Sequence, residues 1–97
     1  MIIEVDGAFL NSEMDFYGIV SDGIGVDSDY CSNLDALWDL FTTDVERPFR
    51  IVFRNSTAAR KKMPVFFDKL LALLRDVESQ DRELGLAEGE RFELIVE

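Results

Sequence analysis

The 97-residue chain contains no histidine and only one cysteine, Cys31. Without histidine, zinc sites of the usual type and any serine–histidine or cysteine–histidine catalysis are absent. A lone cysteine cannot form an internal disulfide, which agrees with a reducing compartment. With no histidine to activate it, we expect Cys31 to be a free thiol in a loop near a binding surface, where substitution by serine would leave the fold intact.

Lysine and arginine are also missing from the first 46 residues, which carry eleven carboxylates and therefore a formal charge of −11. From Arg47 onward, ten basic residues meet nine acidic ones, which gives a charge of +1. Such a one-sided negative field repels RNA and acidic membranes and attracts basic proteins. Acidity also aids solubility, but solubility does not require the complete exclusion of basic residues from almost half of a chain.

Long apolar runs are a third absence. No stretch approaches the roughly 18 residues that a membrane span needs, and no basic segment precedes an apolar stretch at the N-terminus. We therefore expect a cytoplasmic protein that makes no membrane contact. The length, with 47% apolar and 11% aromatic residues, indicates a single packed domain over residues 1–97.

The chain does contain short strand and helix patterns in alternation. Runs rich in β-branched and aromatic residues predict strands at 1–5, 49–53 and 92–96. Helical periodicity and capping residues predict helices at about 12–23, 33–43, 56–62 and 64–84. Strands separated by helices favour parallel pairing with right-handed crossovers. The expected fold class is therefore α/β, a small three-stranded parallel sheet packed with about four helices.

Two of these helices have specific boundary signals. In the first, Met14 and Tyr17 begin an apolar stripe that Gly23 is expected to end. In the third, Ser56 can act as the N-cap. The basic run at 60–62 lies at the C-terminal end of that helix, where the helix dipole favours cations. We therefore assign this run to a helix terminus and not to a nucleic-acid site.

The helix expected at 33–43 has two different faces. Asn33 is a good N-cap, and apolar residues recur from Leu34 to Phe41 at a spacing that docks one side on a core. Asp35 and Asp39 fall together on another side, where like charges repel by a few tenths of a kcal/mol. A fold gains nothing from that repulsion, so this face is either a plain solvated surface or a binding site.

The run Asn33–Asp39, which reads Asn-Leu-Asp-Ala-Leu-Trp-Asp, resembles a motif of the barstar family, the intracellular inhibitors of a secreted bacterial ribonuclease. Thr42, Val45–Glu46 and Pro48 also match that family. The similarity extends weakly from the beginning of the chain to about Val77 and resumes in the last strand, after an insertion of several residues. Seven consecutive matched residues that include a tryptophan make this motif specific.

The resemblance implies a barstar-like fold and a function without catalysis, cofactor or metal. The chain would bind a basic ribonuclease or related toxin one-to-one and cover its active site with carboxylates in the places of RNA phosphates. Asp39 matches the family's chief phosphate mimic, Asp35 matches its partner, and Asp76 falls on an interface glutamate. The full set of implied partner-binding residues is Asp29, Tyr30, Asn33, Leu34, Asp35, Trp38, Asp39, Thr42 and Asp76.

The chain departs from the family in the loop before this helix. Asp29 stands where the family has a contacting tyrosine, and Cys31 and Ser32 replace a glycine and a glutamate. These changes keep open a second interpretation, a barstar-like module that binds another cationic partner. A third interpretation is an enzyme that uses Asp35 and Asp39 as an acid–base pair or metal site. It is disfavoured because no nucleophile, histidine or obvious pocket accompanies these carboxylates.

Overall fold

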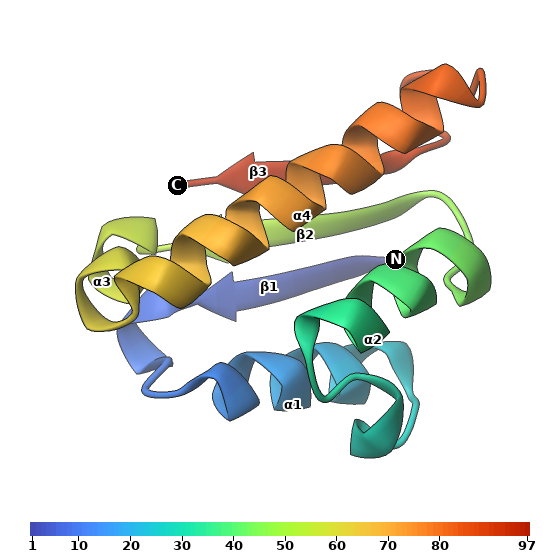
Figure 1. Ribbon diagram of the computed structural model, residues 1–97. Helices are drawn as coiled ribbons and strands as arrows, with labels where there is room; N and C mark the ends of the chain where they lie inside the picture. The colour runs from blue at the N-terminus through green and yellow to red at the C-terminus, as the bar shows by residue number, and fades with distance from the viewer.

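The computed structural model describes all residues, Met1–Glu97, and contains one sheet of three parallel strands in the order β1–β2–β3 (Figure 1). The strands form where β-branched and aromatic residues concentrate, at β1 (Ile2–Asp6), β2 (Phe49–Arg54) and β3 (Phe92–Val96). Helical segments separate them along the chain, so each connection is a crossover between parallel neighbours. The prediction of a small α/β fold with a three-stranded parallel sheet is confirmed.

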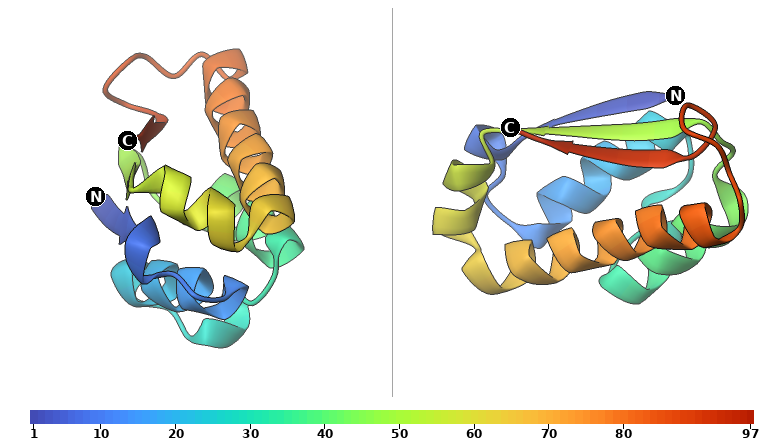
Figure 2. Two further views of the ribbon diagram at one scale, coloured as in Figure 1. Left: turned by 90° about the vertical axis from the view of Figure 1, so that its left-hand side faces the viewer. Right: turned by 90° about the horizontal axis from the view of Figure 1, so that it is seen from above.

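Four α-helices accompany the sheet: α1 (Glu13–Ile24), α2 (Leu34–Asp39), α3 (Ser56–Lys62) and α4 (Pro64–Glu83). Short 3₁₀ helices, η1 (Gly7–Phe9) and η2 (Ser28–Tyr30), precede α1 and α2, and a π-helical segment, η3 (Leu40–Asp44), extends α2. Helices α1, α2 and α4 lie on one side of the sheet, and α3 lies at its end (Figure 2). None of the helices is both long enough and apolar enough to cross a membrane.

The sheet therefore buries one of its two faces. Ile3, Ile51 and Leu94 are register partners across the three strands, and each is at most 5% exposed beneath the helices. The other face carries cross-strand ion pairs such as Arg54 Nη2 to Glu4 Oε1 at 3.1 Å. Buried apolar residues recur at every second position of the strands, and they decide which face receives the helices.

Helix α4 is the main packing helix, as its apolar spacing predicts. Pro64 occupies its first turn, where the missing N–H costs no hydrogen bond. Leu71 and Leu73, which the sequence also assigns to the packing face, are only partly buried. The residues that it buries among the apolar core are Phe66, Phe67, Leu70, Leu74 and Val77.

The expected boundary of α1 was wrong by a short distance. The helix runs to Ile24 and ends at Gly25, whose φ of 87° is the left-handed conformation that glycine adopts without a steric penalty. Gly23 therefore lies inside the helix. Tyr17 of the predicted stripe is buried, together with Phe16, Val20 and Ser21, whereas Met14 is 57% exposed.

Helix α3 also begins differently from the prediction. Asn55, and not Ser56, holds the N-cap position, with a φ of 53°, and makes no side-chain cap. The Asn55 amide instead donates to Asp6 Oδ1 at 2.8 Å. The prediction considered only local capping, whereas Asn55 ties the end of β2 to the end of β1. The basic run at 60–62 does lie in the last turn of α3.

A buried ion pair joins the end of α4 to the segment that enters β2. Asp81 is 2% exposed and accepts hydrogen bonds from Arg47 Nε at 2.7 Å, Arg47 Nη2 at 3.2 Å and the Phe92 N–H at 2.7 Å. Arg47 also donates to the carbonyls of Val45 and Phe41, each at 2.7 Å. Desolvation alone would raise the pKa of Asp81, but the hydrogen bonds from Arg47 and Phe92 outweigh it and hold this pKa below its usual value.

Side chains of α4 also occupy the outer edge of β3. The N–H groups of Phe92 and Leu94 face away from β2 and donate to Asp81 Oδ2 at 2.7 Å and to Glu78 Oε2 at 2.8 Å. Arg75 Nη1 donates to the Leu94 carbonyl at 3.2 Å. Three side chains at three-residue spacing therefore satisfy backbone groups for which a neighbouring strand is absent.

We expect Asp81→Asn to lower the free energy of unfolding by about 3 kcal/mol near neutral pH, because Arg47 would lose its buried counter-charge. The pKa of Asp81 is lower in the folded protein than in the unfolded chain. Its contribution is therefore present above the unfolded pKa of about 4 and is lost as the pH falls through the folded pKa. Urea unfolding of parent and variant should show their difference shrinking below about pH 4.

Glu83→Gln is the matched control for this measurement, because Glu83 is an exposed carboxylate near the same end of α4. It should change the free energy of unfolding by no more than about 0.5 kcal/mol. A difference between the parent and Asp81→Asn that stays constant from neutral to acid pH would contradict the assigned role of this ion pair.

Candidate functional site

Helix α2 is held at its beginning and along its buried side. Asn33 Oδ1 accepts the Ala36 N–H at 2.8 Å, which confirms the predicted N-cap. Leu37 and Phe41 are fully buried, and the Phe41 ring meets Phe49 of β2 edge to face with their centroids 5.0 Å apart. The opposite side of the helix therefore faces solvent, while the cap and the core contacts fix the position of the helix.

The far end of the helix is anchored by η3, which reaches Asp44, slightly beyond the predicted boundary. The Val45 N–H donates to the Leu40 carbonyl at 3.1 Å and closes a π turn. The Phe41 carbonyl near this end accepts from Arg47. The ion pair between Arg47 and α4 thus holds the end of the α2–η3 segment in place.

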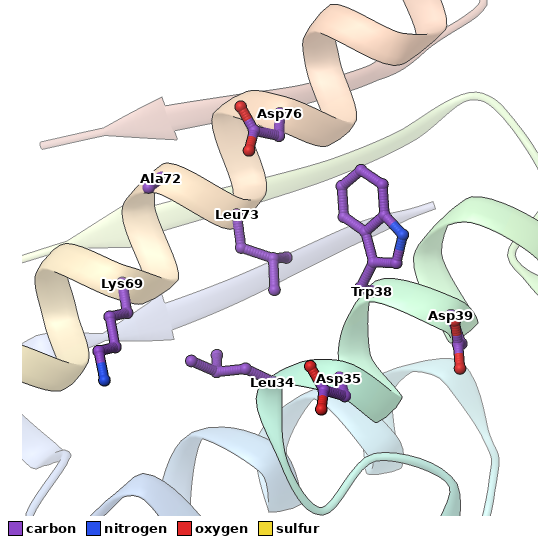
Figure 3. A pocket seen from close by; sticks show the side chains of 8 residues that line it. All are labelled: Leu34, Asp35, Trp38, Asp39, Lys69, Ala72, Leu73 and Asp76. Carbon is purple, nitrogen blue, oxygen red and sulfur yellow. The ribbon is translucent and has the colours of Figure 1, made fainter.

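A groove of about 600 Å³ lies between α2 and α4 (Figure 3). Leu34 and Trp38 of α2 and Leu73 of α4 extend into the space between the two helices and make its floor apolar (Figure 3). The complete lining consists of Leu34, Asp35, Trp38, Asp39, Lys69, Ala72, Leu73 and Asp76. An apolar floor with charged borders is the composition of a surface that binds another molecule.

The carboxylates of this groove have no partner within the protein. Asp35, Asp39 and Asp76 are exposed, and their side chains make no hydrogen bond or ion pair in the structure. Free carboxylates on a supported helix can accept charge-assisted hydrogen bonds from arginine or lysine of a second molecule. No group of three or more acidic and cysteine side chains in the structure could hold a metal ion.

The structure distributes the nine residues implied by the sequence over four places. Asn33 caps α2 and borders a hollow next to the groove. Asp29 and Tyr30 are exposed in η2, and Thr42 donates its hydroxyl to the Trp38 carbonyl at 2.7 Å. These four residues do not line the groove. The remaining five do line it: Leu34, Asp35, Trp38, Asp39 and Asp76.

Sequence reasoning missed three lining residues, all on α4. Lys69 and Ala72 received no site role, and Leu73 was assigned to the core. With Asp76 they occupy relative positions 0, 3, 4 and 7, which is the spacing of one helical face. The positions three, four and seven residues before Asp76 share its helical face, and this spacing would have identified them.

Cys31 is a free thiol in the loop before α2, as expected, but it is fully buried. It is unpaired, it belongs to the apolar core, and desolvation raises its pKa to about 11. Its neighbours Tyr30 and Ser32 are exposed, which means that the loop turns inward at this one residue. Cysteine often packs as a small apolar residue. The exposed residues on either side of Cys31 gave no signal in the sequence that its side chain is buried.

These features define a small parallel α/β protein in which an acidic helix borders an open groove. A family model described as Barstar (barnase inhibitor) matches residues 1–96, and the chain belongs to this family. The resemblance seen in the sequence is thereby confirmed. Members of the family are inhibitors of a ribonuclease rather than enzymes. No curated protein sequence matches the chain.

Burial of Cys31 changes the expected behaviour of its variants. We expect Cys31→Ser to lower the free energy of unfolding by about 1–3 kcal/mol, because the serine hydroxyl would be buried in an apolar site. The native thiol should react with a disulfide reagent only when the protein opens, and at once in urea. Rapid labelling of the folded protein would show that the thiol is accessible.

Proposed function

We propose that the protein inhibits a basic ribonuclease by covering its active site with α2, whose carboxylates take the places of RNA phosphates. The observation that carries this proposal is the groove between α2 and α4, where unpaired Asp35, Asp39 and Asp76 surround an apolar floor. Membership of a family described as barnase inhibitors supports a ribonuclease as the target.

The chemistry of the target explains why carboxylates suit this task. A ribonuclease stabilises a phosphodiester transition state and needs cationic side chains aimed at its phosphate site. Carboxylates accept the hydrogen bonds that arginine would otherwise give to phosphate, often in bidentate geometry. Because α2 is fixed by its N-cap, by Leu37 and by the Phe41 carbonyl, these groups enter the site without a large ordering cost.

The residues of the groove then divide into two roles. Asp39, Asp35 and Asp76 would pair with cations of the ribonuclease, whereas Leu34 and Trp38 would supply apolar contact in the middle. Asp29, Tyr30, Asn33 and Thr42 lie beside this centre and would contact its border. One groove on one chain predicts a one-to-one complex.

Asp39→Ala should separate binding from stability. It relieves repulsion with Asp35 near the C-terminal end of a helix, so the free energy of unfolding should change by no more than about 0.5 kcal/mol. In the complex it would leave cations of the ribonuclease desolvated and unpaired, which should weaken inhibition by at least about 2 kcal/mol, or roughly 30-fold. Inhibition of barnase and of other basic bacterial ribonucleases measures the second effect, and urea unfolding the first.

Two variants serve as controls for this test. Asp22→Ala removes the same charge from an exposed position of α1 outside the groove, so it should inhibit nearly as well as the parent. Leu37→Ala removes a fully buried side chain and should cost about 2–5 kcal/mol of stability. If Asp39→Ala inhibits as well as Asp22→Ala, the acidic face is only a solvated surface.

Association with the ribonuclease should slow as salt is added. The first 46 residues carry a charge of −11, and their attraction for a basic partner is screened over a Debye length of ~8 Å at physiological ionic strength. Stopped-flow association rates should therefore fall from low to high salt, with a smaller effect on dissociation. An association rate that does not depend on salt would count against electrostatic attraction as the driving force.

A further inference from the structure

A second hollow, of about 300 Å³, lies beside the groove and extends it toward α1. It shares Leu34, Asp35 and Lys69 with the groove. A space at the lower end of the range for ligand pockets can take one long side chain of a second molecule. The complete lining comes from α1, from the cap and first turn of α2, and from α4: Glu13, Tyr17, Asn33, Leu34, Asp35, Val65, Phe66 and Lys69.

Tyr17 brings an unpaired polar group to this second hollow. Tyr17 is only 2% exposed, and its ring packs edge to face against Phe16 and Phe66. Its backbone carbonyl accepts from the Ser21 hydroxyl, but its own hydroxyl makes no hydrogen bond within the protein. No fully buried side-chain oxygen or nitrogen in the structure lacks a partner, so the Tyr17 hydroxyl reaches the surface, in the hollow that Tyr17 lines. A buried tyrosine usually has a hydrogen-bond partner, and here a second molecule can supply it.

Glu13 lies one turn before Tyr17, on the same face of α1. The side-chain hydrogen bonds at the start of α1 use Ser12 and Asp15. Glu13 is exposed and makes neither a hydrogen bond nor an ion pair. Burial, with a smaller contribution from the charge of Glu13, raises the pKa of Tyr17 to about 12. The hydroxyl is therefore neutral at ordinary pH and lies within range of the Glu13 charge.

The charges around the second hollow favour a cationic occupant. Glu13 and Asp35 are both unpaired, whereas Lys69 is the only cation in the lining, which leaves a net charge of −1. Lys69 opposes a cation, but it is exposed, and its flexible stem can turn the ammonium toward solvent. The proposed target is itself a basic protein, so arginine and lysine are the side chains that it is most able to offer.

The other features of the second hollow suit the same occupant. Its apolar part includes Val65, which is 68% exposed. Arginine and lysine combine an aliphatic stem with a cationic head, so the stem would cover Val65 while the head reaches Glu13 and Tyr17. The N–H groups of the head can donate to a carboxylate and to a hydroxyl oxygen at the same time. A basic side chain thus satisfies the charge, the apolar surface and the unpaired hydroxyl together.

We propose that the second hollow binds an arginine or lysine side chain of the ribonuclease from beside its active site, held by Glu13 and the Tyr17 hydroxyl. This inference rests on the proposed function and adds a specificity-determining contact to it. Asp39 and Asp76 lie outside the hollow and would meet the cations that ribonuclease chemistry requires. A basic residue beside the active site is not required by that chemistry and can differ between enzymes. Glu13 and Tyr17 would therefore determine which ribonuclease is inhibited.

Tyr17→Phe removes only the hydroxyl, changes no charge and leaves the ring in its aromatic packing. The assay uses the ribonuclease that the parent inhibits most tightly, from a basic bacterial panel that includes barnase. We expect Tyr17→Phe to weaken inhibition about fivefold to tenfold, the usual value of one hydrogen bond, mainly through faster dissociation. Its midpoint in urea should equal that of the parent or lie slightly above it, because the hydroxyl has no partner within the protein.

Glu13→Gln and Asp22→Asn form a matched pair for the carboxylate. Each removes one negative charge from α1, but Asp22 is exposed and lines neither the groove nor the second hollow. Glu13→Gln should inhibit at least about tenfold less well, the scale of a hydrogen bond to a charged group, whereas Asp22→Asn should inhibit nearly as well as the parent. Combined with Tyr17→Phe, Glu13→Gln should lose less than the product of the two single losses, because both residues hold one side chain. Urea unfolding checks that each variant is folded.

The outcomes separate this contact from the proposed function. If either Tyr17→Phe or Glu13→Gln inhibits as well as Asp22→Asn, the inference is overturned, and a loss in Asp39→Ala then leaves the proposed function standing without it. Lys69→Gln should inhibit at least as well as the parent. A loss in Lys69→Gln would show that the hollow takes an anion and would also overturn the inference. If the parent inhibits no ribonuclease of the panel, the proposed function fails and this inference fails with it.

A charge exchange identifies the complementary group. Glu13→Lys should lose more inhibition than Glu13→Gln, because a cation would then face the basic side chain. Single Arg→Glu or Lys→Glu variants of the ribonuclease, at positions outside its active site, should include one that restores inhibition by Glu13→Lys. A complete scan with no such variant would overturn the proposed contact with a basic side chain.

Discussion

The ion pair between Arg47 and Asp81 is the contact on which the geometry of the groove depends. The two residues are 34 positions apart, and between them they bind the carbonyls of Phe41 and Val45 and the first N–H of β3. The end of the α2–η3 segment and the end of α4 therefore meet at one point. Because α2 and α4 are the two walls of the groove, this contact links the walls at one end, in addition to the core that packs between them. Its role is geometric, since desolvation offsets much of the attraction within a buried pair.

Folding leaves the charge asymmetry of the chain almost intact. The basic residues of the second half pair mainly with carboxylates of the same half, as in Arg47–Asp81, Arg50–Glu93 and Arg75–Glu78. Among the carboxylates of the first 46 residues, only Glu4 forms an ion pair. The ion pairs thus lie mainly within the second half, and the negative charge of the first 46 residues is not neutralised. Folding therefore preserves the negative field of the first 46 residues.

Local patterns in the sequence predicted the strands, the packing helix and the cap of α2, because periodicity and capping depend on neighbouring residues. The same reasoning found the carboxylates of α2, and the family resemblance added Asp76. It could not find the Arg47–Asp81 pair, whose partners meet only in the folded chain, nor the inward turn at Cys31. Lys69 was missed for a different reason. Its apolar neighbours at helical spacing are visible in the sequence, but its place in the lining of the groove is visible only in the folded structure.

The side chains on the outer edge of β3 have a consequence for the behaviour of the protein at high concentration. An uncovered sheet edge can recruit a strand from another chain, and this is a common route to aggregation. Asp81 and Glu78 already hold the N–H groups that such a strand would need at β3. At the opposite edge, β1 carries the charged Glu4 on its exposed face. The carboxylates that bind α4 to β3 therefore also oppose extension of the sheet beyond β3.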